Sequence, residues 1–559
     1  MRRGRPGDGI PAWILVAAAF SFPIAGAYAF TGDAPMSFSR SLTDEALLET
    51  AVMPAVDAEA YLEEDEGKID GPFRFAAPHY VYLNVTEEGT LDVLADGSRV
   101  WRLRVASEGA LSLNFGFTTY DLPGGASLHM YEAGQAGGEL LWEGPFSASD
   151  RVEREFWSPV IPGEEAVLEV YSPAGSADPR LVVGQVNHDY RGFFGKADDG
   201  SLPGSCNIDV ICPQADAWRD EIRSAGVYTL NGNWVCSGQM LNSLTSPKDP
   251  YFLTASHCGV STSNDHTMRV YWNKESAVCG NLCCGPVTDN QLGAERVANY
   301  TGSDFTLVRL NADPDPDWDV AYAGWDARED WRPQGCTAIH HPGTTVKTIS
   351  WNYDPITVTS YLQNAQPGNG THWRVDDWEV ATTEVGSSGS GIWDENRRVV
   401  GQLHGGYASC SSITSDWYGR LSKSFVGGGS AATRLKDWLD PENTGVEYLD
   451  GSGGGSASVE EAPAALLAGA LRSITPNPAT GAVRIGFDLA RGGSARFDVV
   501  DVAGRVVRSL EAGDHGAGSW TVAWDGTGRD GASLPAGVYF VRMGLGERLL
   551  GTQKVILVR

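Results

Sequence analysis

Basic residues are scarce in this sequence. Its 559 residues include 42 Lys and Arg against 71 Asp and Glu, which gives a formal net charge of −29 at pH 7. A chain this acidic repels phosphate groups, which argues against nucleic acid or an anionic membrane surface as its main partner. Such a surface instead suits a soluble secreted protein and attracts basic substrates weakly.

Long apolar runs are missing after the N-terminus. The one run of note, Ala12 to Ala27, is too short to span a bilayer comfortably. Three arginines precede it and Ala27-Tyr28-Ala29 supplies a cleavage site, so we expect a secretory signal peptide over residues 1–29. An uncleaved anchor is the alternative. With the signal removed, no stable membrane span is expected, and the protein should be extracellular or attached to a cell surface.

Cysteine is absent from both ends of the chain. All nine cysteines lie between Cys206 and Cys410, and in an oxidising compartment they can pair. Because nine is odd, at least one must be free or bonded to another chain. The sequence also lacks Cys-x-x-Cys pairs and His-x-x-x-His spacing, so neither a metal site nor another cofactor is expected.

The cysteine-free N-terminal part has two sections. Residues 30 to about 70 are acidic and rich in Ala and Glu, with a short helix expected around Thr43 to Val52. Between about residues 71 and 190, apolar and polar residues alternate in short runs separated by Pro and Gly turns. This pattern predicts a β-sandwich of roughly a hundred residues. The polar segment Lys196 to Gly204 is typical of an exposed linker.

The rest of the chain also predicts β structure. Residues 204–450 hold every cysteine and many short strand candidates, which favours an all-β barrel fold with one short helix at Ala431 to Leu439. A Gly/Ser/Ala linker follows over residues 451–470. Residues 471–559 form a second cysteine-free β module with Asp-Gly turns. We therefore expect an all-β protein.

A serine set among glycines lies at Glu384 to Gly391. Glycine allows positive φ and close approach of a substrate, and the N–H groups of such a turn can converge on an oxyanion. On its own the stretch fits a flexible linker better, because most Gly/Ser runs are linkers. A base, an orienting acid and a specificity pocket elsewhere in the chain would change that interpretation.

Two residues upstream offer the missing groups. His257 follows an apolar strand in Thr254-Ala-Ser-His-Cys-Gly259, where Cys258 can anchor the loop. Asp304 precedes the alternating strand Phe305 to Leu310 and is either a turn residue or a buried acid that orients the imidazole. The order His, Asp, Ser is that of chymotrypsin-type serine proteases. Together the three elements favour nucleophilic catalysis by serine over a linker.

Six motifs are spread over residues 204–451: Gly204-Ser-Cys-Asn-Ile-Asp-Val-Ile-Cys-Pro213, Phe252-Leu-Thr-Ala-Ser-His-Cys-Gly259, Ser303-Asp-Phe-Thr-Leu307, Thr383-Glu-Val-Gly-Ser-Ser-Gly-Ser390, Gly401-Gln-Leu-His-Gly-Gly406 and Ser415-Asp-Trp-Tyr-Gly-Arg420. In these motifs the chain resembles the bacterial lysyl endopeptidases of the Lys-C type. The resemblance implies a chymotrypsin-like double β-barrel. It also implies His257 as general base, Asp304 as orienting acid and Ser388 as nucleophile, with the N–H groups of Gly386 and Ser388 as the oxyanion hole.

The same resemblance implies a lysine pocket. Asp416, in the Ser-Asp-x-Tyr-Gly-Arg motif, would pair with the substrate's ammonium group, because an unpaired buried charge is very costly. A turn aspartate that caps Trp417 is the alternative. The Gln-Leu-His-Gly-Gly motif adds His404 and Gly405 as substrate-binding residues. In the family this histidine packs on a tryptophan, and the corresponding stretch here, Tyr361 to Gln366, has none.

The cysteines follow the same motifs. The resemblance implies three disulfides: Cys206–Cys410, Cys212–Cys279 and Cys236–Cys258. Three cysteines lie outside the family pattern: Cys283, Cys284 and Cys336. We predict that Cys336 bonds to one of the adjacent pair and that the other stays free.

Activation of the precursor is expected to differ from that of trypsin. In trypsin-like zymogens an aspartate just before the nucleophile pairs with the new N-terminus, and here that residue is the uncharged Ser387. Residues 30–203 are instead expected to act as a pro-region that aids folding or blocks the cleft, as in the resembling enzymes. A protease that recognises lysine would process itself after Lys196, with Arg191 as the runner-up.

The C-terminal module has a resemblance of its own. Its sequence is similar to type IX secretion sorting domains, which are Ig-like sandwiches, in Ile474-Thr-Pro-Asn-Pro-Ala479, Leu534-Pro-Ala-Gly-Val-Tyr-Phe540 and Lys554-Val-Ile-Leu-Val-Arg559. This implies export across an outer membrane by the type IX secretion machinery. A generic Ig-like adhesive domain is the alternative.

The function expected from the sequence is that of a secreted serine endopeptidase that cleaves after lysine through an acyl-enzyme. Its partners would be protein or peptide substrates with basic residues. Arginine or dual Lys/Arg preference is the rival within the enzyme class. A surface adhesin with an inactive protease-like domain is the rival outside it, although the presence of all three triad residues argues against that.

Overall fold

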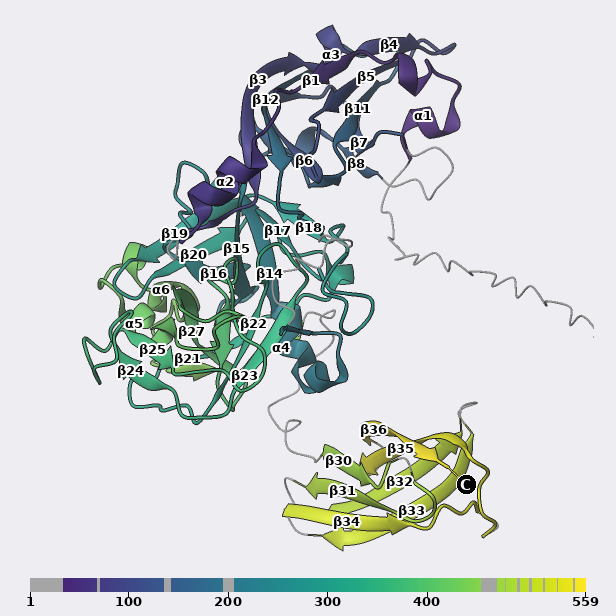
Figure 1. Cartoon of the computed structure of the whole chain (residues 1–559), viewed down its shortest axis with the longest axis vertical. Coiled ribbons are helices and arrows are strands. Elements are labelled where there is room, and N and C mark those ends of the chain that lie inside the picture. Colours follow the sequence, from purple (N-terminus) through teal and green to yellow (C-terminus); the bar gives the residue numbers. More distant parts are fainter. Residues whose placement is uncertain are drawn as a thin grey trace, which may run out of the picture. The chain divides into compact units, whose positions relative to one another are not determined.

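The computed structural model is a mostly β protein that divides into two compact units, Met1–Ser456 and Ala457–Arg559 (Figure 1). It describes residues 34–67, 71–134, 142–194, 206–453 and 470–558, with short gaps in the last range at 478, 490–492, 502–504, 516–517, 530 and 546–547. The expected signal peptide, Lys196 and most of the 451–470 linker lie outside the described residues. Within them, no helix combines the length and the apolarity needed to cross a membrane.

Two sheets form an N-terminal β-sandwich, and its alternating strands direct apolar side chains such as Phe115, Phe117 and Leu168 into a shared core. The first sheet contains β4 (Thr90–Val93), β1 (Thr50–Val52), β5 (Arg99–Ala106), β11 (Glu165–Ser172), β7 (Ser127–Glu132) and β8 (Glu143–Phe146). The second contains β10 (Ile161–Pro162), β9 (Phe156–Trp157), β6 (Ser112–Asp121), β12 (Arg180–Asp189) and β3 (Ala76–Asn84). Short helices α1 (Met36–Ser39) and α3 (Val85–Glu88) flank them.

The helix expected around Thr43 to Val52 is largely wrong. The structure has a single 3-10 turn there, η1 (Glu45–Leu47), followed by strand β1. β1 pairs in parallel with β5, because pairing with a sheet edge outweighs the weak helix-forming tendency of so short a run. The next helix is α2 (Ala58–Asp65), where the Asp57 carboxylate accepts the Ala60 N–H as an N-cap.

Residues 206–453, named the protease part after the family that their motifs resemble, contain two sheets, which confirms the expected double β-barrel fold. The first sheet holds β18 (Asn290–Leu292), β17 (Arg269–Tyr271), β14 (Ala225–Leu230), β15 (Trp234–Met240), β16 (Tyr251–Ala255), β20 (Phe305–Leu310) and β19 (Ala294–Tyr300). The second holds β13 (Ile208–Asp209), β23 (Thr348–Asn352), β22 (Cys336–His340), β26 (Gly391–Trp393), β27 (Arg398–Gly406), β28 (Asp416–Arg420), β25 (His372–Val375), β24 (Thr357–Thr359), β21 (Gly324–Asp326) and β29 (Tyr448–Leu449).

Helices in the protease part are short. They are η3 (Pro213–Trp218), α4 (Arg219–Ser224), η4 (Asp265–Thr267), η5 (Pro316–Trp318) and α5 (Leu421–Val426), and two more lie within residues 431–439. The helix expected at Ala431 to Leu439 is divided into a 3-10 turn, η6 (Ala431–Thr433), and α6 (Lys436–Leu439). Ser430 caps the 3-10 turn through a reciprocal contact with Thr433.

The N-terminal part and the protease part share a hydrophobic core. Phe75 and Phe193 pack there with Val227, Val235 and Tyr271, and all five side chains are almost fully buried. Burying one such side chain stabilises a fold by about 1.5–3 kcal/mol, so the two parts stabilise each other. A two-residue strand, β2 (Phe73–Arg74), also extends the first protease sheet by pairing with β15.

The second unit is a separate β-sandwich. One sheet contains β30 (Ala470–Thr475), β31 (Val483–Leu489) and β34 (Gly518–Trp524), and the other contains β33 (Val506–His515), β32 (Gly493–Asp501), β35 (Gly537–Leu545) and β36 (Arg548–Leu557). Phe487, Phe497 and Trp524 are fully buried between the sheets. This unit has its own core and needs no cysteine to close it.

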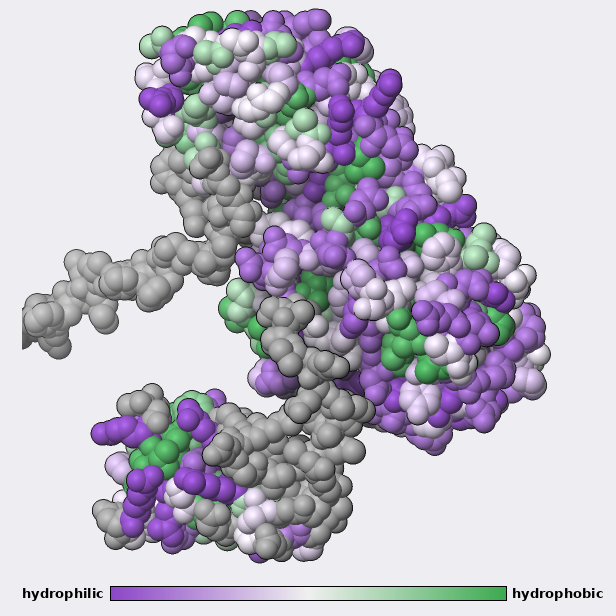
Figure 2. Space-filling model, turned by 180° about the vertical axis from the view of Figure 1, so that it is seen from behind, coloured by the Kyte–Doolittle hydropathy of each residue, from purple (hydrophilic) through white to green (hydrophobic). Residues whose placement is uncertain are grey.

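On the face shown in Figure 2, polar residues predominate and apolar residues gather in several separate patches. Exposed large side chains include Tyr80 and Tyr82, which are alternate residues of β3. Their neighbours Val81 and Leu83 pack against the sandwich core, as the two-residue period of a strand requires.

Three disulfides join the pairs that the resemblance implies: Cys206–Cys410, Cys212–Cys279 and Cys236–Cys258. The expected bond from Cys336 is wrong, because Cys283 and Cys284 bond to each other and Cys336 is free. The adjacent pair lies in the loop between β17 and β18 of the first sheet. Cys336 lies in β22 of the second sheet, where it is buried beside the Asn352 amide.

The free thiol should be identifiable by labelling. Burial raises the pKa of the Cys336 thiol to about 12, so a thiol reagent should leave the native protein unmodified and label one cysteine after denaturation without reductant. Peptide mapping by mass spectrometry should place the label on Cys336, and Cys336→Ser should remove it. A label on Cys283 or Cys284 would contradict the disulfide pattern.

Candidate active site

His257 and Asp304 meet at the ends of two paired strands. β16 ends two residues before His257, β20 begins directly after Asp304, and the antiparallel register sets Ala255 opposite Phe305. As a result His257 Nδ1 lies 2.8 Å from Asp304 Oδ2. Because a carboxylate only accepts hydrogen bonds, the neutral imidazole carries its proton on Nδ1 and leaves Nε2 as the basic atom.

Asp304 is held rigidly in this position. Its side chain is 4% exposed, and Oδ1 accepts the backbone N–H of His257 at 2.9 Å. Its carbonyl oxygen accepts the Ser256 N–H and, at 3.2 Å, the Gln402 Nε2. The residue adopts the left-handed region with φ 55°, which Asp tolerates better than most residues. The carboxylate therefore has one orientation, toward the imidazole.

Ser388 lies on a tight turn between Gly386 and Gly389. Both glycines have positive φ, 91° and 84°, and a Cβ at either would lie 2.4 Å or less from neighbouring atoms, including the carbonyl oxygens of Gly343 and Ser237. Ser237 also donates its N–H to the Ser388 carbonyl at 2.8 Å and its hydroxyl to the Gly386 carbonyl at 2.9 Å. Close packing explains these glycines, and the stretch is not a linker.

Several polar atoms around Ser388 have no partner among the described residues. They are the backbone N–H groups of Gly386 and Ser388 and the buried Nε2 of His257. Cys258 Sγ lies 3.9 Å from the Ser388 carbonyl oxygen, which brings the histidine loop against the serine turn. Ser388 and His257 Nε2 are not hydrogen-bonded to each other, and a contact of this kind between a nucleophile and its base often tightens only when substrate binds.

Asp416, the first residue of β28, lines a cleft of about 470 Å³ together with Ser388 and Gly405. It is 1% exposed, and its Oδ2 accepts hydrogen bonds from Trp378 Nε1 at 2.8 Å and Thr383 Oγ1 at 2.6 Å. Burial raises the pKa of its carboxyl to about 6, although these hydrogen bonds lower it. The residue is part of the cleft rather than a surface turn.

Glu384 supplies a second carboxyl group to the same cleft, and the sequence did not single it out. Its Oε1 accepts the Cys410 N–H at 3.3 Å, and its Oε2 is buried with no partner among the described residues. Burial raises the pKa of this carboxyl group. Its only signal in the sequence is its position four residues before the nucleophile candidate. With Asp416, it makes the cleft suited to a cation.

His404 stacks between two other rings. It occupies a bulge in β27, with ring centroids 5.4 Å from His257 and 3.6 Å from Tyr361. Its Nδ1 lies 2.9 Å from His372 Nε2 and 3.7 Å from Asp304 Oδ2. Tyr361, in the stretch that lacks the family's tryptophan, thus supplies the ring that packs on His404.

His372, in β25, is a further site residue that only the structure reveals. Burial lowers its pKa to about 4, so the ring is neutral at working pH. The Thr371 hydroxyl donates its one proton to Asn369 Oδ1, and it can therefore only accept from His372 Nδ1. His372 Nε2 then accepts the proton on His404 Nδ1, which directs that proton away from Asp304.

Two clusters of described residues could each offer three metal-ligand atoms within 4.8 Å of one another: His257, Asp304 and His404, and the exposed Asp354, Asp377 and Glu379. In the first cluster the Nδ1 atoms are already hydrogen-bonded, to Asp304 and to His372. The second is an acidic surface group of a common kind. Neither arrangement assigns a metal to this site.

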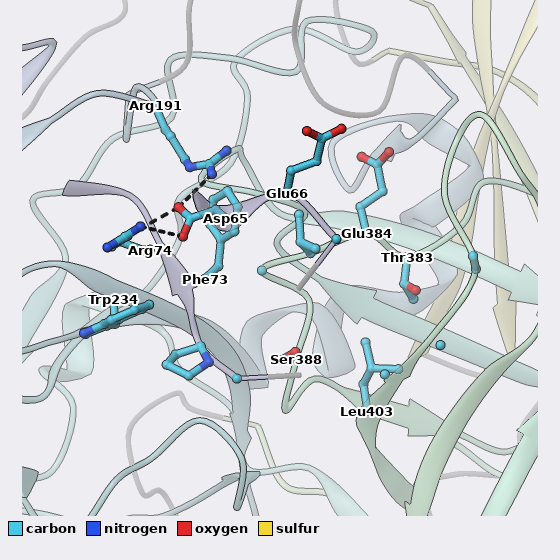
Figure 3. A pocket seen from close by; sticks show the side chains of 18 of the residues that line it. Asp65, Glu66, Phe73, Arg74, Arg191, Trp234, Thr383, Glu384, Ser388 and Leu403 are labelled. Atoms are coloured by element: carbon cyan, nitrogen blue, oxygen red, sulfur yellow. Dashed lines mark hydrogen bonds and ion pairs between the residues drawn. The ribbon is translucent and has the colours of Figure 1, made fainter. Parts of the chain in front are cut away.

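A segment of the N-terminal part lines the cleft as well. Leu62 to Gly67, at the end of α2, and Gly71 to Arg74, leading into β2, both contribute to its wall. β2 pairs with β15 next to Cys236, which is bonded to the cysteine after His257. Figure 3 shows Glu66 and Glu384 above Ser388 in this cleft.

An ion cluster fixes the two ends of this segment. Asp65 accepts hydrogen bonds from Arg74 Nη2 at 2.8 Å and Arg191 Nη2 at 3.0 Å (Figure 3). It also accepts the Tyr190 hydroxyl at 2.9 Å. The Asp65 and Arg74 side chains are each 11% exposed, so solvent screens this pair less than a surface pair. Arg74 also lies over the Trp234 ring.

Three family models match the chain. The lysyl endopeptidase C-terminal domain matches residues 201–419, the lysyl endopeptidase N-terminal domain matches residues 92–189, and the FlgD Ig-like domain matches residues 473–545. Among solved structures, a Glu endopeptidase in complex with MPD is 15% identical with a TM-score of 0.27, covering 39% of this chain and 93% of that one. The Rv3671c protease of M. tuberculosis H37Rv is 15% identical with a TM-score of 0.25, covering 38% and 86%.

A lysyl endopeptidase from Pseudomonas aeruginosa is similar over a much longer stretch. It is 30% identical over 347 residues, which cover 57% of this chain and 71% of that protein. The matched stretch is longer than the protease part alone, and both lysyl endopeptidase domains match here. The chain belongs to the lysyl endopeptidase family and is a serine endopeptidase.

Proposed function

We propose that the protein cleaves peptide bonds on the carboxyl side of lysine, with Ser388 as nucleophile, His257 as general base and Asp304 as orienting acid. The observation that carries this proposal is the buried carboxylate of Asp416 in the same cleft as Ser388. An ammonium group that leaves water must gain an anionic partner, since an unpaired buried charge is very costly. The lysyl endopeptidase named above supports the same specificity.

The proposed reaction follows from the positions of these groups. Ser388 Oγ attacks the carbonyl carbon while His257 Nε2 takes the hydroxyl proton, and the N–H groups of Gly386 and Ser388 stabilise the oxyanion. His257 then gives the proton to the leaving amine, and an acyl-enzyme remains. Water attacks the ester through the same base, which releases the new carboxyl end and restores the serine. Asp304 stabilises the imidazolium formed in both steps.

Lysine suits this cleft better than arginine. Asp416 Oδ2 already accepts two hydrogen bonds, from Trp378 and Thr383. A guanidinium group binds a carboxylate best through both oxygens at once, whereas an ammonium group needs a single point of contact. At low pH the carboxyl groups of Glu384 and Asp416 become uncharged, which would weaken the binding of either cation. The proposal therefore predicts that specificity depends on pH.

Specificity should depend on pH in a way that follows the Asp416 carboxyl. Below its pKa of about 6 the carboxyl is neutral and cannot pair with lysine, so the preference for lysine should fall as pH drops through 6. The measurement is the ratio of kcat/KM for matched peptides with lysine or norleucine before the cleaved bond, because titration of the base cancels in that ratio. At pH 8, Asp416→Asn should lower the ratio by roughly 10²–10³.

Ser388→Ala and an arginine peptide complete this experiment. Ser388→Ala should abolish cleavage of all the peptides, and the arginine peptide should be cut more slowly than the lysine peptide. A ratio that stays constant between pH 5 and pH 8 in the wild type would contradict the role of Asp416. A faster arginine reaction would favour the rival specificity instead.

We also propose that the N-terminal part is a pro-region that keeps the enzyme latent, and that processing follows Lys196. Support for latency comes from the segment that lines the cleft beside Ser388 and from the cluster of Asp65, Arg74 and Arg191 that fixes its ends. A substrate needs the space and the β15 edge that this segment covers. N-terminal sequencing of the wild type and Ser388→Ala tests self-processing, since an identical mature terminus in both would rule it out.

Removing the Asp65 carboxylate should expose the active site before processing. A hydrogen bond to a charged group is worth about 1.5–3 kcal/mol, so Asp65→Ala should speed fluorophosphonate labelling of Ser388 in the unprocessed chain by about tenfold or more. Glu59→Ala is the control, because it removes one exposed carboxylate from the same helix. Equal labelling rates in both variants would argue against a role for the Asp65 cluster in keeping the enzyme latent.

For residues 471–559 we propose a role in export through the type IX secretion machinery, with the protein secreted or held at the cell surface. The support is the motif resemblance together with the FlgD Ig-like match. In a host with that machinery, a chain that ends at residue 453 should stay inside the outer membrane while the full chain appears outside. Equal export of both would favour a generic adhesive module.

A further inference from the structure

A buried histidine that the proposed reaction does not use lies directly behind the serine turn. His340 is the last residue of β22 and is 1% exposed. Its Nδ1 lies 2.8 Å from the hydroxyl of Ser387, and its Nε2 lies 2.9 Å from the hydroxyl of Ser350 in β23. Ser387 itself is fully buried. The residue before the nucleophile therefore has an imidazole as its partner.

Each hydrogen bond in this contact has one possible donor and one possible acceptor. The Ser350 hydroxyl donates its one proton to the Thr382 carbonyl at 3.0 Å, so it can only accept from His340 Nε2. A neutral imidazole with its proton on Nε2 has a bare Nδ1, which must accept from the Ser387 hydroxyl. The Ser387 oxygen in turn accepts the Glu384 N–H at 3.3 Å.

The imidazole stays neutral throughout the working range. Burial lowers the pKa of His340 to about 3, and the hydroxyl of Thr348 is the other polar side-chain group near its ring nitrogens. The contact between Ser387 and His340 is therefore a hydrogen bond between uncharged groups. It does not need an ionised chain terminus, which is the usual partner of an acid at this position.

The chain of hydrogen bonds ends at the backbone that forms the oxyanion hole. Ser387 lies between Gly386 and Ser388, whose N–H groups have no acceptor among the described residues. Ser387 N–H donates to the Glu384 carbonyl, and its own carbonyl accepts the Ser390 N–H, so the turn is closed on both sides. The Ser237 hydroxyl holds the Gly386 carbonyl, and the side chain of Ser387 adds a further contact that sets the tilt of the two peptide planes flanking Ser387.

We propose that His340 is a positioning residue that holds the Gly386–Ser388 turn in its oxyanion-binding conformation through the Ser387 hydroxyl. The inference rests on the proposed function, in which Ser388 is the nucleophile. A histidine that merely fills the core would also be buried and hydrogen-bonded. What separates the two roles is a defect confined to the transition state, because an oxyanion hole acts on developing charge and contributes little to substrate binding.

Four variants of the processed enzyme test this. Ser387→Ala removes the hydroxyl that reaches the turn, and His340→Leu removes the imidazole with little change in size. The double variant combines the two. His340→Asn is the matched control, because its amide oxygen can take the place of Nδ1 as acceptor for Ser387. Active-site titration and thermal unfolding report the folded fraction, and Ser387→Ala carries the test where His340→Leu does not fold.

The expected result is a loss in kcat of roughly tenfold to a hundredfold for Ser387→Ala and His340→Leu, with KM of a lysine peptide within about twofold of the wild type. A lysine peptide aldehyde, which forms a tetrahedral adduct, should bind more weakly by a similar factor, while the product peptide acid should bind unchanged. The double variant should be no worse than either single variant, because both act on one contact. His340→Asn should recover most of the activity.

Unchanged kcat in both single variants would overturn the proposal, as would additive losses in the double variant. A loss that appears equally in KM and in product binding would also overturn it, because it would indicate general disorder of the cleft. A wild-type enzyme that neither cleaves peptides nor gives an active-site titration would refute the proposed function itself, which is a separate outcome.

Discussion

The rest of the site depends on the hydrogen bond between the Asp304 carboxylate and His257, and both protease sheets are needed to hold this pair in place. The first sheet sets His257 and Asp304 at the same end of β16 and β20. The second sheet stabilises their position, because Gln402 donates hydrogen bonds to the carbonyl oxygens of Ser303 and Asp304. Gly419 approaches so closely that a Cβ there would lie 1.8 Å from the Ser303 oxygen. Neither sheet could form this geometry without the other.

The sequence could predict the site residues whose neighbours along the chain indicate their chemistry. His257, Asp304, Ser388 and Asp416 lie in short motifs at strand ends, where residue type and chain order already indicate the chemistry. The all-β fold follows from short alternating runs and turn signals in the same way. These features are local, and a single sequence carries them.

The residues that escaped prediction depend on neighbours from distant strands. Tyr361, His372 and His340 are ordinary in sequence, and only the structure shows the rings and hydroxyls that they contact. The bond between Cys283 and Cys284 likewise could not be chosen without knowing that Cys336 lies in the other sheet. The pairing of β2 with β15 was also unexpected, since a strand of two residues carries no pattern that would indicate its partner.

The disulfides have a consequence for where activity can arise. All four lie between residues 206 and 410, and both sandwiches are closed by apolar cores alone. In a reducing compartment the sandwiches could fold while the protease part would lack its crosslinks, including Cys236–Cys258, which pins the histidine loop. Because such crosslinks form and persist only under oxidising conditions, the geometry of the histidine loop is tied to the redox state of the chain's surroundings.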